Sequence, residues 1–310
     1  MAHPTARKTA IVGIGATEFS KNSGRSEMQL AVEAVKAALD DAGLTGADID
    51  GMATFSMDNN WEISILNQVG GNELKWFSRT EYGGGAACGP LTHAAIAVAS
   101  GLCETVVCYR ALNERSGFRF GSGQLMDNNP LNPNIIHFSW YFPYGFMTPA
   151  GWIAMSARRY MHEFGATEED FGRIAVAMRD FASTNPNAFF YNRPLTLEEH
   201  QASRMIADPL RLPDCCQESD GAVAYVVTSA ERAKDLKQTP AVIAAARQSA
   251  THETAMMTPY YGETIVGIPE HGVAAREIYQ MADLTPDDID VACLYDHFSP
   301  WMLPQLEEFG

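Results

Sequence analysis

Apolar and polar positions along this chain predict strands and helices in alternation. Residues 9–15 form a short apolar run with glycines at its end, typical of a buried strand and a turn, and a helical pattern follows from Ser26 to Gly43. Glu18 stands where a G-x-G-x-x-G dinucleotide motif needs its third glycine. Further helices are predicted at 154–164 and 168–184, and further strands at 105–109, 222–227, 241–245 and 291–295. This alternation indicates an α/β fold.

Two distant parts of the chain share one pattern. Residues 31–56 resemble residues 271–296 at a constant offset, with identical pairs at Leu44/Leu284, Thr45/Thr285, Asp48/Asp288, Ile49/Ile289 and Asp50/Asp290. A chain of 310 residues is long enough for two fused half-domains. The repeat therefore predicts two halves built on one plan.

The segment after residue 82 combines a glycine-rich turn with a helix and a strand. Gly83, Gly84 and Gly85 open it, and an alanine-rich helix runs to Ser100. Consecutive glycines let a ligand approach the backbone closely and present N–H groups, although a strained turn explains them as well. Residues 113–150 are rich in Asn, Pro, Gly and aromatic residues, which predicts a loop or cap insertion.

Composition narrows the classes of partner. With 38 acidic against 22 basic residues the net charge is −16, and no Lys/Arg cluster offsets it, so nucleic acid is not an expected partner. The chain has no signal-peptide pattern and no apolar stretch of about 18 residues to span a membrane. Its six cysteines lack metal-ligand spacing, so we expect reduced thiols in the cytoplasm, without disulfides or a bound metal.

The run from Leu294 to Trp301 contains the two candidate catalytic residues. Tyr295 and His297 lie two positions apart just after a predicted strand, and an extended backbone places them on the same side. A free phenol has a pKa of about 10, so a tyrosine base needs a partner. His297 is expected to lower that pKa as a cation, or to pass the proton on. The competing explanation is a core tyrosine beside a structural histidine.

Four stretches, at 9–20, 157–188, 206–229 and 294–307, resemble the thiolase superfamily and its sterol-carrier/lipid-transfer-protein branch. The resemblance implies an α/β thiolase-like fold: two pseudo-repeated βαβαβαββ halves in a layered α/β/α/β/α arrangement. Residues 1–112 and 150–235 would form the N-terminal half, 113–150 an insertion, and 236–310 a C-terminal half. We expect that second half to be incomplete here, because a late Gly-His-Pro-x-Gly loop would fall beyond Gly310.

The chain departs from true thiolases at two positions. The thiolase cysteine nucleophile aligns with about Gly84, while Cys88 lies one helical turn further on and is expected to be a packing thiol. Where thiolases read Asn-Glu-Ala-Phe, this chain reads Tyr295, Asp296, His297 and Phe298. In both respects the chain resembles the retro-aldolases that remove the last side-chain carbons of steroid acyl-CoA thioesters.

The resemblance implies a carbon–carbon lyase that cleaves a β-hydroxyacyl-CoA to a ketone and a short acyl-CoA. Tyr295 and His297 would be catalytic, and Gly83, Gly84 and Gly85 would bind substrate. Coenzyme A enters only as part of the substrate. The resemblance also implies a partner with a zinc ribbon and an OB fold, which would hold any zinc, and a homodimer within that complex. Two alternatives stay open: a thiolase or acyltransferase that uses Cys88, and a non-catalytic lipid-binding or scaffold subunit.

Overall fold

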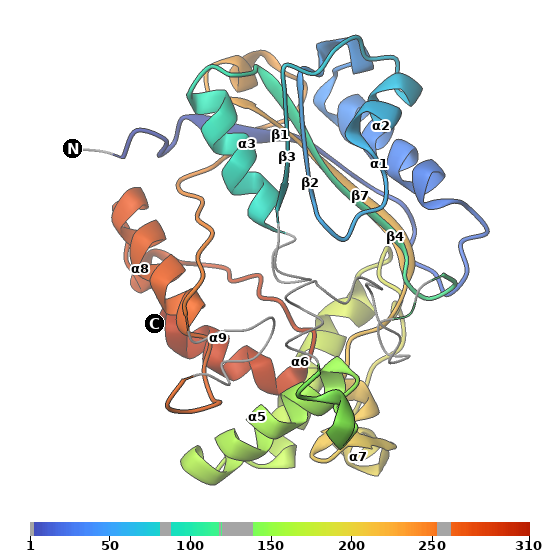
Figure 1. Ribbon diagram of the computed structural model, residues 1–310, viewed down its shortest axis with the longest axis vertical. Coiled ribbons are helices and arrows are strands. Elements are labelled where there is room, and N and C mark those ends of the chain that lie inside the picture. The colour runs from blue at the N-terminus through green and yellow to red at the C-terminus, as the bar shows by residue number, and fades with distance from the viewer. Residues whose placement is uncertain (1–2, 81–87, 118, 120–138, 253–261) are drawn as a thin grey trace. The chain divides into compact units, whose positions relative to one another are not determined.

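The computed structural model describes residues 3–80, 88–117, 119, 139–252 and 262–310 (Figure 1). They form two compact units, each assembled from segments far apart in the sequence. Unit 1 consists of Met1–Gly117, Ser219–Gln248 and Arg276–Asp288, and unit 2 of Phe118–Glu218, Ser249–Ala275 and Ile289–Gly310. The division into repeated halves predicted from the sequence stays a prediction, because these units are defined by packing.

Unit 1 is built on a mixed sheet in the order β3-β2-β4-β7-β1-β8. Its strands are β1 (Thr9–Ala16), β2 (Gly51–Phe55), β3 (Trp76–Thr80), β4 (Thr105–Asn113), β7 (Asp220–Ser229) and β8 (Ala241–Val242). Strand β2 is parallel to β3 and β4, whereas β7 is antiparallel to β4 and β1. The strand predicted at 241–245 is therefore shorter than expected, because only its first two residues pair with β1.

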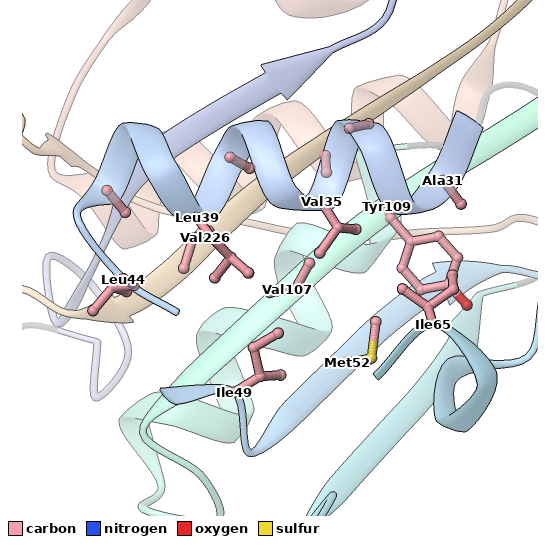
Figure 2. Packing of buried hydrophobic residues seen from close by; sticks show 14 of the residues in the cluster. Ala31, Val35, Leu39, Leu44, Ile49, Met52, Ile65, Val107, Tyr109 and Val226 are labelled. Atoms are coloured by element: carbon pink, nitrogen blue, oxygen red, sulfur yellow. The ribbon is translucent and has the colours of Figure 1, made fainter. Parts of the chain in front are cut away.

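Helices cover both faces of this sheet. They are α1 (Glu27–Ala42), α2 (Glu62–Gln68) and α3 (Gly89–Ala99). Val107 and Tyr109 of β4 pack against α1, as Figure 2 shows, while the alternate residues Val106 and Cys108 pack in the cluster of α3. Alternation of this kind along one strand places α1 and α3 on opposite faces.

The N-terminal helix begins and ends as the sequence predicts, but the glycines before it have another role. Ser26 forms a capping box with Gln29, and Gly43 closes α1 in the left-handed conformation with φ 74°. Gly13 and Gly15 lie inside β1 rather than in a turn. A Cβ atom on Gly15 would stand 2.2 Å from the carbonyl oxygen of Ala34 in α1. These glycines let the helix pack closely on the strand.

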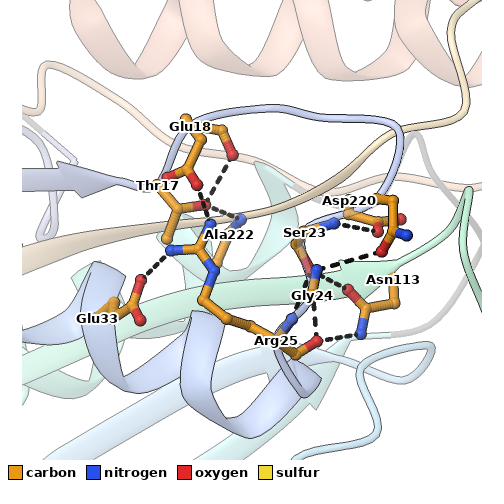
Figure 3. Close-up of polar contacts among 10 residues, drawn as sticks. Thr17, Glu18, Ser23, Gly24, Arg25, Glu33, Asn113, Asp220 and Ala222 are labelled. Atoms are coloured by element: carbon orange, nitrogen blue, oxygen red, sulfur yellow. Dashed lines mark hydrogen bonds and ion pairs between the residues drawn. The ribbon is translucent and has the colours of Figure 1, made fainter.

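A buried carboxylate joins three segments of unit 1 (Figure 3). Asp220, the first residue of β7, accepts hydrogen bonds from the backbone N–H groups of Ser23 at 3.0 Å and Arg115 at 3.0 Å. It also accepts from the N–H of Ser116 at 2.9 Å and from its hydroxyl at 2.5 Å. Burial opposes the charge of Asp220, but these donors outweigh it and its pKa lies below the ordinary value. The carboxylate therefore fixes the end of β4 and the entry to α1.

Unit 2 is mainly helical. Its elements are η4 (Phe142–Tyr144), α5 (Pro149–Phe164), α6 (Glu168–Thr184), α7 (Leu197–Ala202), β5 (Met205–Ala207), β6 (Leu210–Arg211), η5 (Leu212–Asp214), η8 (Ser299–Trp301) and α9 (Met302–Phe309). Helix α8 (Pro269–Ala282) has its first half in unit 2 and its second in unit 1. The core of unit 2 gathers Ile153, Phe171, Leu210, Phe298 and Trp301 from α5, α6, β6 and the C-terminal segment. None of the helices described is long and apolar enough to cross a membrane.

The internal repeat is real at the level of local structure, but it ends sooner than predicted. Thr45 N–H donates to the Asp48 carboxylate at 2.9 Å, and Thr285 N–H donates to Asp288 at 2.8 Å. Both pairs cap short 3-10 helices, η1 (Gly46–Asp48) and η7 (Pro286–Asp288). After η1 the chain enters β2, whereas the strand predicted at 291–295 is wrong. No described residue pairs with that segment as a neighbouring strand, and a strand requires such a neighbour.

Candidate active site

The two residues singled out by the sequence lie against each other in unit 2. The rings of Tyr295 and His297 are stacked, with centroids 4.4 Å apart and an angle of 12° between their planes. The prediction that both side chains point to the same side is therefore confirmed. Tyr295 is 43% exposed while His297 is 4% exposed. The side chain of Tyr295 is therefore partly exposed, while the imidazole of His297 is buried against its ring.

His297 is a neutral base rather than a cation. Burial, with a smaller contribution from the charge of His271, lowers its pKa to about 4, although the hydrogen bond to the Tyr295 carbonyl acts in the opposite direction. At neutral pH this lowered pKa favours the second role expected for His297, which is to pass the proton on, over the first, which is to act as a cation. Nδ1 of His297 lies 3.4 Å from the carbonyl oxygen of Tyr295, which only accepts hydrogen bonds. We therefore assign the hydrogen to Nδ1, which leaves Nε2 as the proton acceptor.

A buried glutamine holds the backbone of Tyr295. The side chain of Gln305, in α9, accepts a hydrogen bond from Tyr295 N–H at 3.2 Å and donates one to the Tyr295 carbonyl at 2.7 Å. Its amide nitrogen also lies 3.1 Å from the carbonyl of Trp301. The amide supplies the two hydrogen bonds that a neighbouring strand would supply. Sequence reasoning missed Gln305, because a single glutamine ten positions away forms no motif.

The segment from η5 onward supports the backbone of His297. Cys216 N–H donates to the His297 carbonyl at 2.8 Å, and Cys215 forms an antiparallel bridge with Phe298. Asp214, just before these cysteines, lies 2.8 Å from Nε2 of His200 in a fully buried pair. This pair connects η5 to α7 and was also absent from the sequence prediction. Both ends of the Tyr295–His297 segment are thus held by other parts of unit 2.

A second imidazole belongs to this region. His271 lies at the start of α8, with its ring edge-on to Phe309 at 5.8 Å between centroids. Its Nδ1 is buried and has no hydrogen-bond partner among the described residues, and burial lowers its pKa. The sequence offers no motif around His271. Its electrostatic interaction with His297 is what connects it to the candidate site.

The other predicted site residues belong to unit 1. Gly83, Gly84 and Gly85 lie outside the described residues, so their role in substrate binding stays a prediction. Cys88 is exposed and stands at the N-cap position of α3. The expectation of a packing thiol is therefore wrong, because the helix begins after Cys88 and buries the residues that follow. All six cysteines are free.

Potential metal ligands are scattered within the described ranges. No group of three or more His, Cys, Asp or Glu residues there is arranged to hold a metal ion. Phe298 and Trp301 place their rings edge-on to His297, so the phenol and imidazole groups, which can transfer protons, lie next to apolar side chains.

Comparison with known proteins gives two close relatives, although no protein-family model matches the chain. It is 58% identical over 301 residues to the steroid side-chain-cleaving aldolase of Thermomonospora curvata, covering 97% of this chain and 77% of that protein. It is 54% identical over 303 residues to the 17-hydroxy-3-oxo-4-pregnene-20-carboxyl-CoA lyase of Mycobacterium tuberculosis, covering 98% and 78%.

Solved structures agree with these relatives. The structure titled Ltp2-ChsH2(DUF35) aldolase superposes with a TM-score of 0.94 at 56% identity, over 99% of this chain and 78% of that one. A monomeric SCP2-thiolase-like protein from Mycobacterium smegmatis superposes with a TM-score of 0.72 at 20% identity, over 97% and 63%. The second likeness shows the fold alone, and it confirms the thiolase-like α/β fold expected from the sequence.

Proposed function

The chain belongs to the family of steroid side-chain-cleaving aldolases, and from this premise we propose that it cleaves a steroid β-hydroxyacyl-CoA by a retro-aldol reaction. It is a carbon–carbon lyase of thiolase-like fold. The observation that carries the proposal is the partly exposed phenol of Tyr295 stacked on the buried, neutral His297. A retro-aldol reaction needs a base that removes the proton of one hydroxyl group, and it forms no covalent bond between enzyme and substrate. This pair supplies the base.

In the proposed reaction, the β-hydroxyl of the substrate loses its proton to Tyr295, and the O–H electron pair forms the carbonyl of the ketone. The Cα–Cβ bond breaks, and its electrons form the enolate of the thioester. Nε2 of His297 accepts the proton that passes through the phenol. A proton from solvent then adds to Cα of the enolate and gives the short acyl-CoA, while His297 releases the proton it accepted, so that the protons balance. The net reaction consumes no cofactor and no oxidant.

The enolate oxygen requires hydrogen-bond donors. We assign this role to the backbone N–H groups of Gly83, Gly84 and Gly85, as the sequence pattern predicts. Gly84→Ala is expected to lower the rate of cleavage more than the stability of the protein. A variant that cleaves at the normal rate would remove these glycines from the site.

A partner protein is part of the proposal. The solved Ltp2-ChsH2(DUF35) aldolase, at 56% identity, is named for two components, Ltp2 and ChsH2. We propose that this chain likewise acts with a small partner, one that has a zinc ribbon and an OB fold and holds any zinc of the complex. The cytoplasm is the proposed location, since six free thiols suit a reducing compartment.

We also propose a homodimer within that complex. Strand β3 forms one edge of the sheet, and Phe77 on it is 65% exposed. Ile63 and Trp61, near the start of α2, are exposed as well. An apolar edge strand is suited to pair with a second copy. Light scattering is expected to give a dimer, and Phe77→Lys is expected to weaken it; a wild-type monomer would contradict the proposal.

One observation favours a second activity. Cys88 is an exposed thiol at the N-cap position of α3. A thiolase or acyltransferase reaction would use it as a nucleophile. Inactivation by iodoacetamide that maps to Cys88, together with loss of acyl transfer in Cys88→Ser, would support this alternative.

Product analysis distinguishes the two activities. The chain and its partner protein would be mixed with a β-hydroxy steroid acyl-CoA, and the products identified by mass spectrometry. The lyase proposal expects a ketone and a short acyl-CoA in equal amounts. Intact substrate, with exchange of its acyl group onto labelled coenzyme A, would contradict it and return Cys88 to the centre.

A further inference from the structure

Two arginines of unit 2 lie side by side on a pair of phenyl rings. Cζ of Arg179, in α6, is 3.5 Å from the ring centre of Phe190, and Cζ of Arg193 is 5.3 Å from that of Phe189. The two rings meet edge to face, with centroids 5.1 Å apart. Nη1 of Arg179 also donates to the carbonyl of Arg193 at 3.3 Å. These contacts fix the position of both guanidinium groups.

Neither guanidinium is neutralised by a carboxylate of the described residues. Glu199 is the acidic side chain that acts on Arg179, and its carboxylate already accepts the N–H of Thr196 at 2.9 Å in the cap of α7. Arg173, on the same helix, shows the contrasting case: it pairs with two carboxylates, at 2.6 and 3.3 Å. The chain has a net charge of −16, so two adjacent cations without an acidic partner are unusual in it. Such a pair is suited to bind an anionic ligand.

Two adjacent positive charges repel each other when no anion lies between them. Partial burial lowers the pKa of Arg179, and the positive charge of Arg193 lowers it further. A bound dianion would reverse the second effect. Guanidinium groups bind phosphate through parallel N–H donors, which gives two fixed arginines a strong preference for phosphate esters.

We propose that Arg179 and Arg193 form a binding site for a phosphate group of the acyl-CoA substrate. This inference rests on the proposed function, because a CoA thioester carries phosphate both as a 3′-monoester and as a diphosphate. The pair anchors the nucleotide end of the substrate and takes no part in bond cleavage.

Binding measurements on the full chain test the site. Calorimetric titration with coenzyme A would compare wild type with a double variant, Arg179→Gln with Arg193→Gln. The double variant is expected to bind coenzyme A about tenfold or more weakly, because two charge-assisted contacts are lost. Arg173→Gln removes the same charge from α6 and serves as the control, with an expected change of less than about twofold.

Dephospho-coenzyme A, which lacks the 3′-phosphate, identifies the group bound. A loss confined to coenzyme A assigns the site to the 3′-phosphate, and an equal loss for both ligands assigns it to the diphosphate. Unchanged affinity in the double variant would overturn the inference, and so would an equal loss in Arg173→Gln. Arg193→Gln alone, at an exposed position, keeps the test valid if the double variant unfolds. Because binding is measured without turnover, a failed lyase assay leaves this result interpretable.

Discussion

Phe55 and Tyr295 occupy the same position of the internal repeat, and the molecule treats them in opposite ways. Phe55 ends β2, which lies between β3 and β4, and is 1% exposed, with Arg110 4.4 Å above its ring. Tyr295 ends an unpaired segment and is 43% exposed, with its backbone held by Gln305. One ring contributes packing, and the other presents a hydroxyl. The same position of the repeat thus carries a buried packing residue in its first copy and a partly exposed tyrosine in its second.

The largest effect on stability is expected at the buried ring. Phe55→Ala should lower the free energy of unfolding by about 3–5 kcal/mol, because it leaves a cavity in the core. The matched change at the repeated position, Tyr295→Ala, should cost less than about 1.5 kcal/mol, since half of the benefit of burial is already absent. Urea unfolding measures both. Equal costs would break the comparison.

Asp220 gives a pH-dependent contrast confined to unit 1. Its pKa is lowered in the folded state, so its contribution is present above the unfolded pKa and is lost as the pH falls through the folded value. Asp220→Asn should destabilise the protein by about 2–3 kcal/mol at pH 7 and flatten the acid side of its stability curve. Asp40→Asn, at an exposed position of α1, should change neither. Thermal melts between about pH 3 and 7 measure this. A parallel shift at every pH would show that the charge of Asp220 is unimportant.

The glutamine that replaces a strand neighbour is expected to matter for the reaction. Gln305→Leu keeps the volume but removes both hydrogen bonds to Tyr295, so kcat should fall about 10- to 100-fold while KM changes little. Steady-state kinetics separates the two constants. Gln280→Leu, at an exposed position on α8, is the control. A rise in KM with unchanged kcat would show that Gln305 serves the substrate pocket and not Tyr295.

The smallest effect on stability is expected at the threonine caps that both copies of the repeat share. Thr45→Ala and Thr285→Ala each remove one cap hydroxyl, so each should cost about 0.5–2 kcal/mol. Chemical unfolding of the two variants should give values within about 0.5 kcal/mol of each other. A clear inequality would mean that the two turns differ more than their identical hydrogen bonds indicate.

Local rules explain what the sequence could predict. The caps of α1 and the common side of Tyr295 and His297 depend on residues within a few positions of one another, so spacing predicts them. Pairing between distant segments does not follow from spacing. The strand at 291–295 was therefore predicted wrongly, although its residues match β2 of the first repeat.

The missed residues of the site have the same explanation. Gln305 and the His200–Asp214 pair act through contacts that exist only in the folded unit. The charge state of His297 depends on burial, which one residue type does not disclose. Sequence resemblance identified the reaction, while the burial and the contacts of the candidate residues follow from packing.

Single-turnover cleavage by Tyr295→Phe tests the central claim most directly. The variant differs by one hydroxyl and carries, at position 295, the residue found at position 55. In complex with the partner protein, it should cleave a β-hydroxy steroid acyl-CoA at least about 100-fold more slowly than wild type. Its melting temperature should stay within about 2 °C of the wild-type value, since the ring and its stacking on His297 remain. A folded Tyr295→Phe variant with a near-normal rate would contradict the assignment of Tyr295 as the base.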